Sequence, residues 1–305
     1  DFCLSRGLGD VYKRQSLQWD GTPRLDEWII TAANAANTPY TRAVSSLVLI
    51  AAVRRVRTPG CKFDEMLVLE SPTQGLLKST AIRTLCHDPV WFSDDLPLNA
   101  DSKNLIERTA GKWLIEAADL SGMRASDHEN LKSMLSRQVD GPVRLAYARL
   151  AVEQPRQFVI IGTTNSSEYL SDVTGNRRFW PLRVGEFQIE WLRAHRDHLW
   201  AEACHREAAG EPIRLDPSLW GAASLQQEAR VFSHPWLEAL SEEYSTRESG
   251  VRLTPEEIWN YLQVPMDRRT TPGNRTITGA MQTIGYRKIT MRTDEGKVVM
   301  GWGRD

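Results

Sequence analysis

Met66-Leu-Val-Leu-Glu-Ser-Pro-Thr-Gln-Gly-Leu-Leu-Lys-Ser-Thr80 carries the strongest structural signal in the chain. Its first five residues form a short apolar run that ends in a charge and then in Ser71-Pro72, which predicts a buried strand. A helix should follow from Lys78 to about Cys86. Strand, turn, Lys-Ser-Thr and helix are the context required of a Walker A phosphate loop.

The residue types of this loop suit phosphate chemistry. Loop amides and a helix N-terminus bind phosphate oxygens, a lysine neutralises the β- and γ-phosphates, and a hydroxyl ligates Mg²⁺. Lys78 and Ser79 fill the last two roles. The residues expected to line bound ATP are Gln74, Gly75, Leu76, Leu77, Lys78, Ser79 and Thr80.

The glycines of the loop do not conform to the pattern GxxxxGK[ST]. Pro72 and Leu77 stand where glycine is expected, and Gly75 is the one glycine left. A side chain at Leu77 opposes close approach of the backbone to phosphate. A strand–turn–helix with a chance Lys-Ser-Thr is therefore an open alternative.

Further strands and helices alternate along the chain. The sequence predicts strands at 112–116, 157–162 and 179–184, and helices at 126–137 and 191–209. Two helical segments between Arg24 and Val56 are separated at Asn37-Thr38-Pro39, with Thr38 or Thr41 as the cap. Alternating strands and helices predict a layered α/β fold with a parallel sheet.

Polar residues follow the predicted strands. Glu116 ends the second strand and Asp119 follows it, and such acids hold the Mg²⁺ shell or orient the attacking water. Asn165 follows the third strand, where it can hydrogen-bond the γ-phosphate or the water. Arg177 and Arg178 precede the fourth strand and suit an arginine finger. Each residue alone also fits a solvated strand end, a turn or a surface pair.

The character of the chain changes near residue 216. Helices are expected at Gln226–Ser245, Pro255–Leu262 and Arg275–Ile284, followed by a hairpin of Lys288–Arg292 and Lys297–Trp302 joined by Asp294-Glu295-Gly296. This order indicates a small winged-helix-like module. We therefore divide the chain into a leader at 1–15, a main domain at 16–215 and a C-terminal domain at 216–305.

Composition excludes several classes of protein. The 305 residues are 41% hydrophobic and carry 38 basic and 39 acidic side chains, which is typical of a globular protein and not of a basic nucleic-acid coat. No apolar run reaches the roughly 20 residues that a membrane helix needs. Four scattered cysteines without a CxxC pair favour a reducing cytoplasm. The segment 1–15 lacks a signal-peptide core, and we expect it to be non-native or disordered. We also expect the sequence to be a fragment of a longer chain.

From about Leu25 to Leu215 the sequence resembles the virulence-associated E (VapE) family of P-loop proteins of phages, plasmids and genomic islands. The resemblance rests on the loop described above and on further short runs. These are Asn37-Thr-Pro-Tyr-Thr-Arg42, Gly60-Cys-Lys-Phe-Asp64, Trp91-Phe-Ser-Asp94, Gly111-Lys-Trp-Leu-Ile-Glu116, Leu135-Ser-Arg-Gln-Val-Asp140, Gly162-Thr-Thr-Asn165 and Thr174-Gly-Asn-Arg-Arg-Phe-Trp-Pro181.

The family is similar to superfamily-three replicative helicases, which are ring-forming P-loop ATPases. The resemblance implies an AAA+/helicase-like three-layer α/β/α core, with Lys78 and Ser79 at phosphate and Mg²⁺ and with Glu116 and Asp119 as Walker B acids. It further implies Asn165 as the polar sensor, and Arg177 or Arg178 as a finger acting on a neighbouring subunit. Members often carry a primase-like module upstream.

In the replicative helicases, a hairpin between the second and third strands contacts single-stranded nucleic acid. The side chains here that supply charge and one stacking ring are Lys132, Arg137, Arg144, Tyr147 and Arg149. Asp140-Gly-Pro is expected to be the turn of this hairpin. A solvated helix and loop is the alternative reading of the same residues.

The sequence thus predicts a Mg²⁺- and ATP-dependent helicase-type ATPase that acts on DNA in mobile-element replication and works as a homo-oligomeric ring. A catalytically inactive P-loop module that binds nucleic acid or a replication partner is the main alternative, favoured by Pro72 and Leu77. A small-molecule kinase shares the phosphate loop, but no substrate pocket follows from the order of Asn165 and the two arginines.

Overall fold

A computed structural model of the chain describes residues 18–304, except positions 97, 99, 124, 145–149, 171–174, 232–234, 248–249, 293–295 and 297. At positions 125, 235, 271, 272 and 275 only the backbone is described. The segment 1–15 thus lies outside the described residues. The chain divides into two units, Asp1–Val231 and Phe232–Asp305. This division comes after the helix at 220–228, whereas the change in sequence pattern predicts a boundary at residue 216, before that helix.

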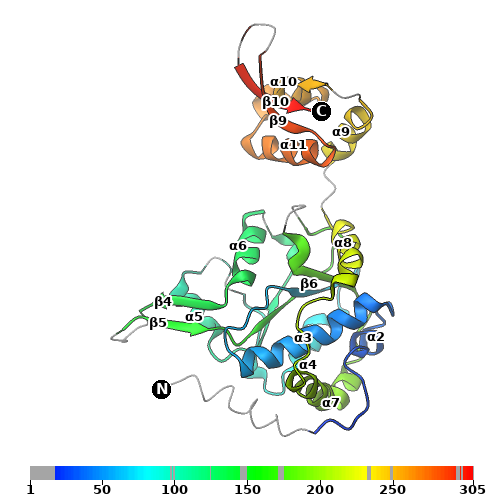
Figure 1. Ribbon diagram of the computed structural model, residues 1–305, viewed down its shortest axis with the longest axis vertical. Helices are drawn as coiled ribbons and strands as arrows, with labels where there is room; N and C mark the ends of the chain where they lie inside the picture. Colours follow the sequence, from blue (N-terminus) through cyan, green and yellow to red (C-terminus); the bar gives the residue numbers. More distant parts are fainter. Residues whose placement is uncertain are drawn as a thin grey trace. The chain divides into compact units, whose positions relative to one another are not determined.

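Five parallel strands form the central sheet of the first unit, in the order β2-β3-β6-β1-β7 (Figure 1). The strands are β1 (Met66–Glu70), β2 (Phe92–Ser93), β3 (Leu114–Ala117), β6 (Val159–Thr164) and β7 (Phe179–Arg183). In the register, Leu67 lies opposite Ile161 on one side and Trp180 on the other. The predicted parallel α/β sheet is confirmed. The two residues of β2 are too few to show a periodic pattern, so this strand was not predicted.

Helices pack on both faces of this sheet, because alternate strand residues enter two separate hydrophobic clusters. Leu67 and Leu69 belong to the larger cluster, with residues of α2, α3, α4, α7 and α8. Met66 and Val68 belong to the other, with residues of α5 and α6. The helices are α2 (Trp28–Ala33), α3 (Pro39–Arg57), α4 (Lys78–Leu85), α5 (Ser102–Thr109), α6 (Ala125–Ser136), α7 (Ile189–Ala208) and α8 (Trp220–Glu228).

The start of α3 follows directly from the sequence. The Thr38 side chain accepts a hydrogen bond from the Thr41 backbone N–H at 3.1 Å, and Pro39 occupies the first helical position. Thr38, rather than Thr41, is therefore the cap of this helix. The helix is buried along most of its length, from Tyr40 to Val56, and forms the centre of the larger hydrophobic cluster.

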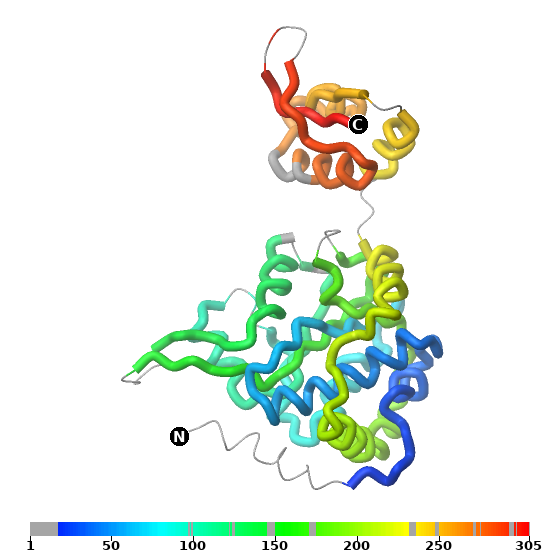
Figure 2. The backbone as a smooth tube through the Cα atoms, in the orientation of Figure 1, coloured from blue at the N-terminus to red at the C-terminus, as the bar shows by residue number. Residues whose placement is uncertain are grey.

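Strands β4 (Val139–Val143) and β5 (Val152–Pro155) form a separate antiparallel ribbon that projects from the body of the first unit (Figure 2). The prediction that Asp140-Gly-Pro forms its turn is wrong, because these residues lie inside β4, with Asp140 opposite Gln154. The reason is a buried ion pair: Arg156, just past β5, holds the Asp140 carboxylate with two hydrogen bonds of 2.6 and 2.7 Å. Strand β4 therefore continues past the expected turn to Val143, which lies opposite Val152.

The second unit has a hydrophobic core of its own, formed around Leu240, Ile258, Ile277, Met281 and Trp302. Its elements are α9 (Pro235–Tyr244), β8 (Arg252–Leu253), α10 (Pro255–Tyr261), α11 (Thr271–Thr283), β9 (Arg287–Arg292) and β10 (Val298–Gly303). The strands form an antiparallel sheet in the order β8-β10-β9. The predicted hairpin at the end of the chain is thus present, although residues 294 and 295 of its expected turn lie outside the described residues.

The helix expected at Gln226–Ser245 is instead two helices, α8 and α9. The Arg230 carbonyl accepts hydrogen bonds from the backbone N–H groups of Tyr169 (3.0 Å) and Leu170 (2.9 Å), so the chain leaves the helical path there. Pro235 then begins α9. The helical periodicity of the two segments does not show this tertiary contact.

Candidate functional site

The predicted phosphate loop joins β1 to α4 at the carboxyl edge of the sheet. Gly75 and Leu77 both have left-handed backbone conformations, with φ of 81° and 60°. For leucine this conformation costs about 1–2 kcal/mol, and it persists only where the surroundings hold it. Backbone hydrogen bonds do so here: the Phe187 N–H donates to the Leu76 carbonyl at 3.2 Å, and the Ala81 N–H to the Leu77 carbonyl at 2.8 Å. Leucine therefore adopts the backbone shape that glycine usually provides.

Lys78, the first residue of α4, points into the site. Its Nζ donates to Ser71 Oγ at 2.5 Å and to Asn165 Oδ1 at 2.8 Å, and the residue is only 8% exposed. Burial lowers the pKa of the Lys78 ammonium, and the negative charge of the nearby Glu116 opposes that shift. Among the described residues, Lys78 forms no ion pair. Its charge is held by neutral oxygens.

Glu116 is the buried acid of the site, with an exposed fraction of 1%. Its Oε1 accepts hydrogen bonds from Ser79 Oγ at 2.7 Å and from Thr163 Oγ1 at 2.6 Å. Within the described part of the chain it has no ion-pair partner. A serine hydroxyl bonded to a buried carboxylate is a donor set that suits Mg²⁺ bound together with phosphate oxygens.

The sheet explains why these distant residues meet. Strands β3, β6 and β1 are neighbours and parallel, so their carboxyl ends lie at one edge. Glu116 lies at the end of β3, Asn165 directly follows β6, and Lys78 is reached through the loop after β1. Of the predicted site residues, Lys78, Ser79, Glu116 and Asn165 are thus brought together at these strand ends.

Asp119, the second acid expected in this site, lies apart from it. Its backbone is left-handed (φ 48°), its side chain is exposed, and its Oδ1 accepts a hydrogen bond from Ser121 Oγ at 2.7 Å. In the described structure, Glu116 rather than Asp119 contacts Ser79. The loop residues Gln74 and Thr80 are exposed, and Leu76 is half-buried.

Arg177 and Arg178 lie at the other end of the strands from the phosphate loop, beside the amino ends of β7 and β1. They form a short 3₁₀ turn, Asn176–Arg178, directly before β7, and the start of β7 is level with the start of β1, with Phe179 opposite Met66. The five residues of β1 span about 17 Å at roughly 3.3 Å per residue. Arg178 donates from Nε to Ser136 Oγ of α6 at 3.1 Å, and Arg177 is exposed. Neither arginine comes near the phosphate loop of its own chain.

The candidate nucleic-acid residues separate into three groups. Lys132 is 7% exposed and donates to Glu129 at 2.9 Å, so it does not present its charge on an open surface. Arg137 and Arg144 are exposed at the two ends of β4. Tyr147 and Arg149 lie outside the described residues.

Sequence reasoning missed several polar groups around the site. Thr163 shares a face of β6 with Ile161, which pairs with Glu116, so strand alternation was the signal that placed it beside this acid. Glu70, at the end of β1, forms a buried ion pair with Arg230 (2.5 Å) and accepts a hydrogen bond from Tyr169 Oη at 3.1 Å. Arg230 follows α8 by two residues and is 160 positions away, and nothing in the sequence pairs it with Glu70.

No described helix is both long and apolar enough to cross a membrane.

Comparisons with known proteins place the chain. A search of curated protein sequences found no match. Among solved structures, the A form apo structure of the NrS-1 C-terminal region is similar, with 9% sequence identity, a TM-score of 0.50, and coverage of 95% of this chain and 78% of that chain. A structure of residues 305–718 of the same region has 11% identity and a TM-score of 0.47, and covers 95% and 77% of the two chains. At these identities the likeness concerns the fold alone.

The sequence profile of the virulence-associated protein E-like domain matches residues 14–232, which include the whole parallel sheet and the phosphate loop. This match spans well over half of the chain. The chain therefore belongs to the virulence-associated protein E-like family.

Proposed function

We propose that this chain is a Mg²⁺-dependent P-loop ATPase of helicase type that acts on DNA during the replication of phages, plasmids or other mobile elements. In this proposal the first unit is an AAA+/helicase-like P-loop core and the second is a winged-helix-like module. One observation carries the proposal: buried Glu116 holds Ser79 beside Lys78 at the edge where the phosphate loop lies.

Each residue of this cluster has a role that follows from its chemistry. Lys78 would exchange its bonds to Ser71 and Asn165 for phosphate oxygens, which offer a full negative charge. Ser79 and Glu116 would hold Mg²⁺, which supplies positive charge to the transferring phosphoryl group. Asn165, released from Lys78, orients the attacking water through its side-chain amide.

Positive charge on the far side of the γ-phosphate has to come from another subunit. The sheet places Arg177 and Arg178 at the edge opposite the phosphate loop, so a finger role for either is possible only in trans. An arginine finger contributes about 10³–10⁵ in turnover. The proposal therefore includes a homo-oligomer, in which isolated subunits hydrolyse ATP slowly.

DNA contact is assigned to the β4–β5 ribbon. Exposed Arg137 and Arg144 lie at the ends of β4 on an element that projects from the first unit, where a nucleic-acid backbone has access (Figure 2). Single-stranded DNA bound there should stimulate hydrolysis.

The test is ATP hydrolysis by the full chain with and without single-stranded DNA. Lys78→Ala and Arg178→Ala should each lose at least about 100-fold in turnover, because each removes a charge that faces the transferring phosphoryl group. Arg83→Ala is the matched control, since it removes an exposed arginine of the same helix as Lys78. Turnover that is equal in all four proteins would refute the proposal.

Leu77 favours a second candidate, an inactive P-loop module that binds DNA or a replication partner. Its left-handed backbone keeps the loop shape, but its side chain is 40% exposed at a position next to the phosphates. This candidate predicts DNA binding without any binding of Mg²⁺–ATP, which equilibrium titration of the full chain measures directly.

A further inference from the structure

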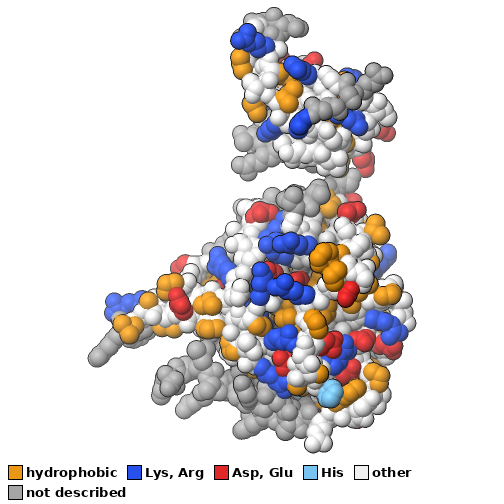
Figure 3. All heavy atoms as spheres, viewed as in Figure 1, with side chains coloured by type: hydrophobic (Ala, Val, Ile, Leu, Met, Phe, Trp, Pro, Cys, Tyr) orange, Lys and Arg blue, Asp and Glu red, His pale blue; other side chains and the backbone are white. Residues whose placement is uncertain are grey.

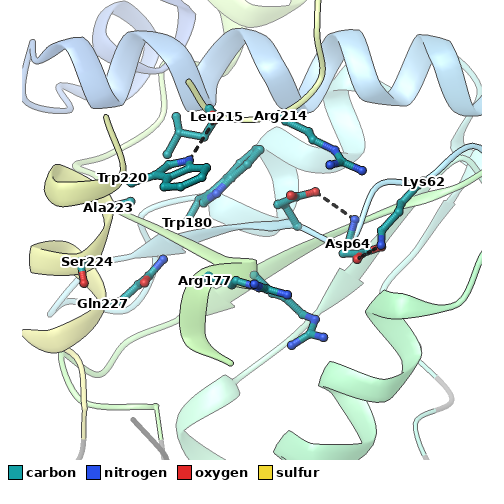
Figure 4. Close-up of a pocket in the computed structure, with 12 residues that line it drawn as sticks. Lys62, Asp64, Arg177, Trp180, Arg214, Leu215, Trp220, Ala223, Ser224 and Gln227 are labelled. Carbon is teal, nitrogen blue, oxygen red and sulfur yellow. Dashed lines mark hydrogen bonds and ion pairs between the residues drawn. The ribbon is translucent and has the colours of Figure 1, made fainter. Parts of the chain in front are cut away.

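A pocket of about 500 Å³ opens at the amino edge of the sheet, beside the turn that carries Arg177 and Arg178 (Figure 4). This volume is in the range that holds a drug-sized ligand. Its walls come from the chain before β1, from the turn before β7, from the segment after α7 and from α8. Four separate parts of the first unit therefore converge on it.

One side of the pocket is cationic. Arg214 enters from the segment after α7 and lies across the opening from Arg177, and Lys62 and Arg178 also line the pocket (Figure 4). Lys62 is paired with Asp64 at 3.4 Å. Arg177 and Arg214 are both exposed, and neither forms an ion pair with a described residue. The lining also includes the carboxyl groups of Asp64 and Glu65, and Arg214 acts electrostatically on Glu65. One lysine and three arginines against these two acids leave an excess of positive charge at the pocket.

The other side of the pocket is apolar. Trp180 is buried, but Trp220 at the start of α8 is 62% exposed, with its Nε1 donating to the Leu215 carbonyl at 3.2 Å. Leu225 of the same helix is 66% exposed. Lys and Arg side chains gather beside hydrophobic ones on this face of the first unit (Figure 3). Exposed tryptophan next to arginine is the composition of protein–protein hot spots.

The chain's own nucleotide cannot occupy this pocket. The phosphate loop follows the end of β1, whereas Glu65, directly before β1, lines the pocket. The length of the strand, about 17 Å, separates the two. Anionic phosphate that reaches Arg177 and Arg214 must therefore be brought by another molecule.

The carboxyl edge of a second copy has the complementary features. It would bring the phosphates bound at Lys78 and the exposed carboxylate of Asp119, which are opposite in charge to the arginines. It would also bring exposed Leu77, an apolar side chain that matches Trp220. Charge and apolar surface are thus paired across the two edges.

We infer that this pocket receives the phosphate-loop edge of a second copy of the chain, and that Arg214 is a third cation that contacts the phosphates of the ATP held there. This inference rests on the proposed function. It adds Arg214 to the expected finger residues and assigns Trp220 as the apolar anchor of the contact between subunits.

The experiment compares turnover by full-length Arg214→Ala, Arg214→Lys and Trp220→Ala with that of Arg193→Ala, which removes an exposed arginine of α7. Arg214→Ala should lose about tenfold or more in turnover, because it removes one cation from the developing charge. Arg214→Lys should recover part of that loss. Trp220→Ala should move the dependence of turnover on protein concentration to higher concentration. Mg²⁺–ATP binding by dilute Arg214→Ala should match the unchanged chain, since its own phosphate loop is intact.

Mixing two variants tests whether each site is formed by residues of two subunits. Lys78→Ala subunits lack the phosphate lysine but keep the pocket, and Arg214→Ala subunits have the reverse defect. Equal mixing should restore turnover above that of either variant alone. If the chain binds and hydrolyses ATP but Arg214→Ala behaves as Arg193→Ala does, or if mixing restores nothing, this inference is wrong and the proposed function stands. If the unchanged chain does not bind Mg²⁺–ATP, both fail.

Discussion

Two buried clusters of charged side chains in the first unit differ in their hydrogen-bond partners: in one the charges pair with each other, and in the other they bond to neutral groups. At the base of the β4–β5 ribbon, Asp140 and Arg156 are 3% exposed or less and meet each other directly, with two hydrogen bonds of 2.6 and 2.7 Å. At the carboxyl edge of the sheet, Glu116 accepts hydrogen bonds from the hydroxyls of Ser79 and Thr163, and Lys78 donates to the neutral oxygens of Ser71 and Asn165. Among the described residues, neither side chain forms an ion pair.

This difference distinguishes a cluster that stabilises the fold from a cluster that can bind a charged ligand. In a buried ion pair the mutual attraction offsets much of the desolvation penalty, whereas a buried charge without a counter-charge costs several kcal/mol. The Lys78–Glu116 cluster keeps a cation and an anion close together but bonded to neutral groups, and both can therefore turn to a charged ligand. In the ribbon pair, Arg156 donates to Asp140 from Nε and Nη2 and to the Met134 carbonyl from Nη1, so its charge already faces a counter-charge. We expect substitutions in the two clusters to have opposite signatures.

The largest effect is expected at the ribbon pair. Arg156→Ala leaves Asp140 buried without a partner and should lower the free energy of unfolding of the first unit by about 3–5 kcal/mol. Urea denaturation followed by tryptophan fluorescence measures this change. The double variant Arg156→Met with Asp140→Leu is the control, and it should recover most of the loss. If the double variant does not recover the free energy of unfolding, the loss in Arg156→Ala does not come from an unpaired buried charge.

Glu116→Gln should produce the reverse result. It preserves the size of the side chain but removes a buried charge, so turnover should fall about 10²–10³-fold while the melting temperature stays the same or rises. ATPase assays and thermal denaturation of the same preparation test both parts. Glu107→Gln is the matched control, because Glu107 is an exposed carboxylate on α5. If Glu116→Gln lowers the melting temperature as much as Arg156→Ala does, then Glu116 stabilises the fold and the prediction is wrong.

A smaller effect is expected at Leu77, where the left-handed backbone of the loop is strained. Leu77→Gly removes the left-handed penalty of a Cβ, about 1–2 kcal/mol, against an entropic cost of about 0.5–1 kcal/mol. The free energy of unfolding should rise by about 0.5–1 kcal/mol, and Leu77→Ala should show no such gain because it keeps the Cβ. A loss of stability in Leu77→Gly would show that leucine packing outweighs backbone strain there.

The smallest effect is a pH dependence at Glu65. Burial raises the pKa of this carboxyl from its ordinary value of 4.5. The unfolded chain therefore ionises first, and stability contributed by the protonated form is lost as pH rises from about 4.5 through the folded-state pKa. Across that window, Glu65→Gln should gain melting temperature relative to the unchanged chain. Glu190→Gln, which changes an exposed carboxylate, should show no such gain. If the difference in melting temperature between Glu65→Gln and the unchanged chain does not depend on pH, this explanation is wrong.

The sequence was sufficient to predict the sheet and most of the phosphate-loop cluster, because these rest on local signals. Apolar runs of strand length predicted β1, β3, β6 and β7, and the ends of three of these strands contributed Glu116, Asn165 and the loop before Lys78. Parallel strands bring such ends to one edge whatever the intervening sequence. The α4 helix begins at Lys78 as predicted.

Tertiary contacts account for what could not be predicted. The Asp140-Gly-Pro segment has turn composition, yet Arg156 holds it within β4. The expected long helix ends early because the Arg230 carbonyl bonds to Tyr169 and Leu170. Arg214 and Trp220 have no motif at all, and only the fold brings them beside Arg177. Nothing local distinguishes such residues from ordinary surface side chains.

Calorimetric titration of Mg²⁺–ATP into the full chain, beside Lys78→Met and Arg156→Ala, distinguishes a ligand-binding cluster from a structural ion pair. We expect saturable binding by the unchanged chain and none by Lys78→Met. Lys78→Met should melt no lower than the unchanged chain, because burial already disfavours the lysine charge. Arg156→Ala should melt lower but bind ATP while it remains folded. Binding that persists in Lys78→Met, or a Lys78→Met protein that unfolds as readily as Arg156→Ala, would contradict the distinction between the two clusters.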